Sequence, residues 1–134
     1  MKLCGRILLF AAVLISSPAI SVNAQTWKEL FDKADSLYWA ANYDSAIVIG
    51  ENALSIISQE FPHRDSISTV FLNLLGNCQR HLGHFESAES LIVMTLNIRE
   101  RYFGPMHLEI AKSLNNLADL YWYSGEYADA VPIV

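Results

Sequence analysis

The sequence is short of cysteine and of basic residues, and each shortage excludes a class of protein. Its 134 residues include two cysteines, of which Cys4 lies in a leader-like segment, so Cys78 has no partner for an internal disulfide. Nine basic residues stand against fourteen acidic ones, a net charge of −5. An acidic surface without a basic stripe repels phosphate backbones and anionic lipid. We therefore expect no nucleic acid partner and no membrane insertion of the mature segment.

The motifs of several enzyme classes are also missing. The chain has no phosphate-cradling glycine loop, no Gly-x-Ser-x-Gly turn and no zinc-protease helix. His81 and His84 have a spacing that can bind a metal, but Gly83 interrupts the helix between them and no further ligand stands nearby. Cys78 lies on an apolar stripe, where we expect a structural thiol. We therefore expect no enzyme, no metal site and no cofactor in this segment.

The first 24 residues have the layout of a secretory signal peptide. Two basic residues precede an apolar run over residues 7–15, and small residues lead up to Ala24, which predicts cleavage after that residue. The run is about half of the roughly 20 apolar residues that a bilayer span needs, so an uncleaved signal anchor is the less favoured alternative. Cys4 precedes the run, whereas a lipoprotein cysteine follows it, so we expect no lipid attachment at Cys4. The expected product is periplasmic or secreted, with seven basic and fourteen acidic residues, a net charge of −7.

The remaining chain repeats itself at a constant lag of 42 residues, without a gap. A period of this size predicts a helical solenoid, in which each unit buries its apolar face against its neighbours. No Pro/Gly/Ser-rich linker or low-complexity stretch interrupts residues 26–134, so we expect one continuous array. The recurring positions are Tyr43, Phe85 and Tyr127; Ala46, Ala88 and Ala130; Ala34, Gly76 and Ala118; and Leu30, Leu72 and Leu114.

Apolar residues at spacings of three and four predict two helices in each unit. Thr26 and Glu29 form a capping box that should begin the first helix, and Asn42 is suited to end it in a left-handed conformation. Breaks such as Gly104-Pro105 divide the array into units over about 27–62, 66–104 and 108–134, the last one truncated. Later helices are expected over about 44–59, from Asp65 or Ser66 to Gly83, over 85–101, from near His107 to Gly125, and from near Tyr127.

Each expected helix has an inward face. Small residues at the recurring alanine and glycine positions should let the paired helices approach closely, with Tyr43, Phe85 and Tyr127 packed beside them. The other residues expected to face inward are Trp27, Leu30, Phe31, Leu37, Tyr38, Ala41, Ile47, Ala53, Leu54, Ile57, Ile67, Phe71, Leu74, Leu75, Cys78, Leu82, Leu91, Ile92, Leu96, Ile98, Ala111, Leu114, Leu117 and Tyr121.

The third unit carries a family resemblance. Residues 113–133, Ser-Leu-Asn-Asn-Leu-Ala-Asp-Leu-Tyr-Trp-Tyr-Ser-Gly-Glu-Tyr-Ala-Asp-Ala-Val-Pro-Ile, resemble the 42-residue tetratricopeptide repeat of kinesin light chains, and residues 97–107 resemble its second helix and loop. The resemblance extends over about 26–134 and implies an all-α fold, a right-handed superhelix of about two and a half helix-turn-helix units. Lys33, Ala41 and Gln79 depart from the family pattern. Lys33 indicates an atypical terminal repeat.

The resemblance further implies that the first helices of the units line a concave groove that holds a peptide. An asparagine amide both donates and accepts, which suits an extended backbone, and Asn73 and Asn115 are the first choices. Arg80 and Lys112 could meet a ligand carboxylate. Each residue also has an ordinary interpretation, as a solvated, ion-paired or helix-stacking side chain. The candidate groove residues are Lys28, Tyr38, Asn73, Asn77, Arg80, Lys112, Asn115, Asn116, Asp119 and Trp122, with Phe31, Asp35, Trp39, His81 and Tyr123 beside them.

The sequence thus predicts a non-catalytic scaffold that binds proteins or peptides, and it leaves two alternatives open. Repeats that resemble these in secreted bacterial proteins often precede a CHAT-type protease domain or a sensor histidine kinase, so the array could be the sensory or recruiting front of a longer enzyme. The inner face of the last unit ends bare at Val134, which motivates that idea. The same exposed helix could instead mediate self-association.

Overall fold

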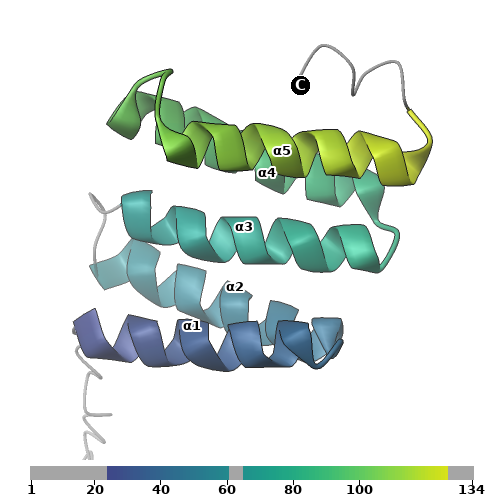
Figure 1. The fold of residues 1–134 in the computed structure, drawn as a ribbon. Helices are drawn as coiled ribbons and strands as arrows, with labels where there is room; N and C mark the ends of the chain where they lie inside the picture. Colours follow the sequence, from purple (N-terminus) through teal and green to yellow (C-terminus); the bar gives the residue numbers. More distant parts are fainter. Residues whose placement is uncertain (1–23, 61–64, 127–134) are drawn as a thin grey trace, which may run out of the picture.

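The computed structural model describes residues 24–60 and 65–126, and these ranges fold into helices without a strand (Figure 1). Their elements are α1 (Ala24–Trp39), α2 (Tyr43–Glu60), α3 (Asp65–His81), α4 (Phe85–Phe103) and α5 (Leu108–Ser124). The all-α prediction is confirmed, and the ends of α2 to α5 lie within two residues of their expected places. Residues 1–23 of the predicted signal peptide, Pro62 and the helix expected from Tyr127 fall outside the described residues.

The helices pack in the order of the chain. Contacts join α1 to α2, α2 to α3, α3 to α4 and α4 to α5, and weaker contacts join α1 to α3 and α3 to α5. Figure 1 shows α1, α3 and α5 side by side in one layer, with α2 and α4 in a second layer behind them. Within the described ranges α1 and α5 do not touch. Contact limited to neighbouring units is the defining property of a solenoid.

Small residues allow the close approach of the helices. Ala34, Ala46 and Ala88 are all fully buried. A Cβ atom added to Gly76 would lie 3.0 Å from the Cγ1 atom of Ile92, so α3 and α4 meet at a position that has no room for a side chain. Three clusters carry the buried apolar side chains: Ala34, Ala46, Leu74 and Cys78; Ala53, Ile57 and Phe71; and Ala88, Ile92, Leu117 and Leu120.

The predicted end of α1 is wrong by one residue. Ala41, and not Asn42, is the left-handed residue, with φ of 58°. The Asn42 N–H donates to the Leu37 carbonyl oxygen, and the same closing bond recurs from His84 to Gln79 and from Glu126 to Tyr121. This bond pattern fixes the left-handed position one residue before each donor. Asn42 instead stands directly before α2 and caps it, because its Oδ1 accepts from the Ser45 N–H at 3.4 Å.

Two further expectations fail at helix surfaces. The α1 helix begins at Ala24, so Thr26 stands inside the first turn and not at the cap, because Ala24 and Gln25 both suit a helix and extend it. Ala41 and Ala111 are exposed. Ala41 belongs to the turn, and the buried side of α5 is set by its contact with α4, which takes Ile110, Ser113, Leu117 and Leu120.

Candidate functional site

The constant lag places nine of the ten candidate groove residues, all but Asn116, in rows that cross α1, α3 and α5. Because these three helices lie side by side, residues 42 apart occupy equivalent places along them. The rows, ordered from the beginning to the end of the helices, are Lys28, Val70 and Lys112; Phe31, Asn73 and Asn115; Asp35, Asn77 and Asp119; and Tyr38, Arg80 and Trp122.

A cavity of about 330 Å³ lies along these rows between α1 and α3, and we call it the groove cavity. Its apolar lining comes from Phe31, Tyr38, Trp39, Val70 and Leu74. Its polar lining comes from Asp35, Asn73, Asn77, Arg80, Arg99 and Asn116. The structure therefore brings five of the ten candidates together: Tyr38, Asn73, Asn77, Arg80 and Asn116.

The other five candidates do not line the groove cavity. Lys28 is exposed near the beginning of α1, and Lys112 donates to the Glu109 carboxylate at 2.7 Å. Asn115, Asp119 and Trp122 are exposed on α5. They extend the rows beyond the cavity along the surface of α5.

The asparagines of the groove differ in how far their hydrogen bonds are satisfied. The Asn116 Nδ2 donates to the Asn73 Oδ1 at 2.6 Å, which ties α5 to α3 across the groove. The Asn77 Oδ1 is buried and has no partner among the described residues. Because a buried polar atom without a partner is costly, Asn77 is the groove amide with most to gain from a ligand.

The rings of Tyr38, Tyr43 and His81 pack together near the end of α1. The His81 ring stacks on Tyr43 with centroids 4.8 Å apart, and its Nε2 lies 3.0 Å from the Tyr38 hydroxyl. Burial, and next the charge of Arg80, holds the pKa of His81 below its ordinary value. Burial also raises the pKa of Tyr38. At neutral pH both rings are therefore uncharged.

The equivalent place at the end of α3 is more open. The lag aligns Tyr38, Tyr43 and His81 with Arg80, Phe85 and Tyr123. There the Arg80 guanidinium lies 5.0 Å from the centre of the Tyr123 ring, and a cavity of about 220 Å³ remains beside it. Arg80 thus contacts the Tyr123 ring of α5, while its charge also acts on the Tyr38 hydroxyl of α1.

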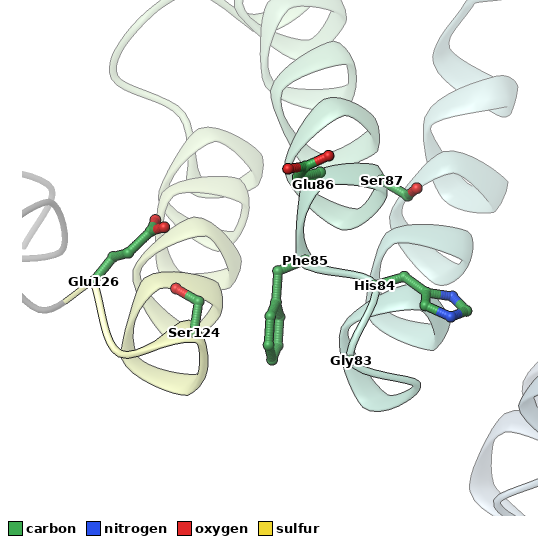
Figure 2. A pocket seen from close by; sticks show the side chains of 7 residues that line it. All are labelled: Gly83, His84, Phe85, Glu86, Ser87, Ser124 and Glu126. Atoms are coloured by element: carbon green, nitrogen blue, oxygen red, sulfur yellow. The ribbon is translucent and has the colours of Figure 1, made fainter.

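A larger hollow of about 500 Å³ lies at the edge of the array, between the turn after α3 and the end of α5. Figure 2 shows the Phe85 ring between the end of α5 and Gly83, with Ser124 and Glu126 on one side and His84 turned to the other.

Arg99 is a buried charge that the sequence patterns did not reveal. It is 6% exposed, donates to the Ser113 Oγ at 2.8 Å and pairs with the Glu109 carboxylate at 3.2 Å. The Lys112 hydrogen bond first, and the charge of Arg99 after it, lowers the pKa of Glu109. Comparison at the lag would have found this network, because Arg99, Glu109 and Ser113 replace three apolar residues, Ile57, Ile67 and Phe71.

Other chemistry is limited in the part of the chain that the structure describes. Over residues 24–60 and 65–126, no group of three or more His, Cys, Asp or Glu side chains is placed to hold a metal ion. No helix in these ranges is long and apolar enough to cross a membrane. Burial raises the pKa of the Cys78 thiol to about 11, so it stays protonated at neutral pH.

Comparison with known proteins identifies the repeat. The profile of the Tetratricopeptide repeat family matches residues 66–133, slightly more than half of the chain. The chain belongs to the tetratricopeptide repeat family. No curated protein matches it. Tetratricopeptide repeats generally serve as non-catalytic scaffolds for protein–protein interaction, and the typical partner of such a tetratricopeptide array is a protein or a peptide.

Proposed function

We propose that this tetratricopeptide array is a non-catalytic scaffold that holds a peptide segment of another protein in the groove cavity and along the surface of α5. The observation that carries the proposal is the cavity of about 330 Å³, in which aromatic side chains stand beside amides. Its volume lies at the lower end of the range for ligand sites, roughly 300–1,000 Å³, and its mixed lining is typical of them.

The unpaired Asn77 oxygen indicates how a peptide backbone is held. Tyr38, Phe31 and Leu74 supply apolar surface for a side chain, while Asn77 lies between Asp35 and Asp119 in its row of the groove. After a small rotation of its side chain, the Asn77 Oδ1 accepts from a backbone N–H of the peptide. That bond satisfies an atom that the described residues leave without a partner.

A selection from random 12-residue peptides, followed by fluorescence anisotropy with the selected peptides, tests this function. Asn77→Ala should weaken their binding about tenfold, the order expected for loss of one buried hydrogen bond. Asn52→Ala is the matched control, because Asn52 is an exposed asparagine on α2 outside the groove. Failure to select any binding peptide, or equal binding by both variants, would contradict the proposal.

We also propose that the protein is exported to the periplasm or the extracellular space and that its repeats are of the kinesin-light-chain-like kind. The layout of residues 1–24 and the gapless period of 42 support these two points. Cell fractionation and N-terminal sequencing test export. Gln25 should be the first residue of the secreted protein, and an intact Met1 in the cytoplasm would refute it.

A second candidate is that the array is the recruiting or sensory front of a longer enzyme, of the CHAT protease or histidine kinase type. One observation favours further packing: Ala111 and Leu114 line an open cavity of about 330 Å³, whereas their equivalents Thr69 and Leu72 are buried. Another repeat or a second copy of the chain would cover this surface. Reading the gene past codon 134 tests the enzyme form, and sedimentation at rising concentration tests self-association.

A further inference from the structure

The charged side chains around the groove are unequally paired. Arg99 and Lys112 both pair with Glu109, and Arg80 lies over the Tyr123 ring. Asp35 lines the groove cavity, and Asp119 is exposed on α5. Neither of these two carboxylates has an ion-pair partner among the residues that the structure describes. Asp35 and Asp119 are therefore carboxylates along the groove rows that remain available to a basic ligand, and Arg80 is a cation of the cavity that likewise has no ion-pair partner among the described residues.

The two free carboxylates occupy equivalent places on α1 and α5, with Asn77 between them on α3. Neighbouring helices pack about 8–10 Å apart, which puts the two carboxylates about 16–20 Å apart. An extended chain advances about 3.3 Å per residue. Five or six residues of extended peptide would thus reach from one carboxylate to the other, and pass over Asn77 on the way.

An exposed indole stands beside the first carboxylate. Trp39 follows Asp35 by four residues, so both lie on one side of α1, and both line the groove cavity. The Trp39 side chain is 77% exposed, which leaves its ring available to a ligand. A carboxylate next to an aromatic face attracts a lysine or arginine side chain by charge and by cation–π contact.

We infer that the groove selects an extended peptide with two basic side chains about five or six residues apart, one bound by Asp35 and Trp39 and the other by Asp119. This inference rests on the proposed function and specifies its ligand. The described ranges contain thirteen acidic and six basic residues, and their net negative charge attracts a basic peptide at long range.

Arg80 sets a limit on where the basic side chains lie. Arg99, the other basic residue that lines the groove cavity, pairs with Glu109. Arg80 stands about one helical turn from the row of Asp35, Asn77 and Asp119. A basic side chain placed in the row of Arg80 would be repelled. Attraction in one row and repulsion in the next fix the register of the peptide.

Peptides selected on the purified chain from a random 12-residue library test the inference. They should be enriched in lysine and arginine at a spacing of five or six. Asp35→Asn and Asp119→Asn should each weaken binding about two- to fivefold, as for exposed ion pairs, and the affinity should fall from 50 to 500 mM NaCl. Trp39→Leu should weaken binding more than Trp39→Phe does, since a phenyl ring keeps part of the cation–π contact.

Asp32→Asn is the matched control, because Asp32 is exposed on the same helix and does not line the groove cavity. Equal losses for Asp32→Asn and Asp35→Asn would overturn the inference, as would selected peptides without basic enrichment. In both cases the proposed function survives if Asn77→Ala still weakens binding. Absence of any selected peptide would reject the function and the inference together.

Discussion

At the scale of single residues, the three turns that follow α1, α3 and α5 share one conformation but not one amino acid. Ala41, Gly83 and Gly125 stand 42 apart and have φ of 58°, 79° and 84°. Glycine adopts this conformation freely, whereas a Cβ atom makes it unfavourable by roughly 1–2 kcal/mol. The first turn is therefore strained where the other two are not.

Exchange of these residues tests the strain. Ala41→Gly should raise the free energy of unfolding by about 1 kcal/mol, and Gly83→Ala should lower it by a similar amount. Urea unfolding followed by circular dichroism measures both. A Cβ atom on Gly83 would meet nothing within 4 Å, so a steric clash does not complicate the comparison. Two variants that shift stability in the same direction would contradict the conformational explanation.

We expect His81 to make the stability of the fold depend on pH. Its pKa is lower in the folded chain than its ordinary value of 6.5, so the unfolded state binds more protons at this site as the pH falls below 6.5. The neutral His81 ring therefore contributes its full stability above pH 6.5. This contribution is lost progressively as the pH falls from 6.5 to the pKa that His81 has in the folded chain. His81→Phe, which keeps a ring against Tyr43, should flatten the decline in melting temperature between pH 7.5 and 5.5. An unchanged profile would show that His81 is not the group responsible.

At the scale of the helices, the two junctions between units are built differently. Ile57, Ile67 and Phe71 join α2 to α3 through apolar contact. At the equivalent positions, polar contacts join α4 to α5: Arg99 donates a buried hydrogen bond to Ser113 and forms an ion pair with Glu109. A buried charge depends on its partners, so the second junction is the more sensitive to removal of one polar group.

Ser113→Ala should lower the free energy of unfolding by about 1.5–3 kcal/mol, because it removes a hydrogen bond to the buried Arg99. The triple variant Arg99→Ile, Glu109→Ile, Ser113→Phe copies the first junction into the second. It should be at least as stable as the parent chain, since apolar replacement of a buried ion pair is often neutral or stabilising. Chemical denaturation measures both variants. A triple variant less stable than Ser113→Ala would disprove the equivalence of the junctions.

At the scale of the whole molecule, a stack held only through neighbours has unequal local stability. The α3 helix contacts all four other described helices, whereas α1 contacts only α2 and α3. Opening of an end unit breaks fewer contacts than opening of the centre. Amide hydrogen exchange should therefore be slowest in α3 and faster in α1 and α5, and uniform protection of all helices would contradict a solenoid.

Much of this architecture could be predicted from the sequence, because the repeat of 42 residues sets the positions of the helices, the turns and the small contact residues. Ala34, Gly76 and Ala88 marked the close approaches, and the glycine turns marked the ends of α3 and α5. The search for apolar stripes passed over Arg99, because it is a charge that folding buries, although comparison of positions 42 apart shows it in the place of Ile57. The repeat could not show that Asn73 pairs with Asn116, one position beyond its equivalent Asn115, since that bond depends on the relative placement of α3 and α5.

The most direct measurement of the central claim is a map of amide and side-chain NMR shifts during titration with a selected peptide. Peptide binding in the groove should shift the signals of Tyr38, Asn73, Asn77 and Asn116, with little change along α2 and, apart from Arg99, along α4. Shifts confined to α2 and α4, or spread evenly over all helices, would contradict peptide binding in the groove.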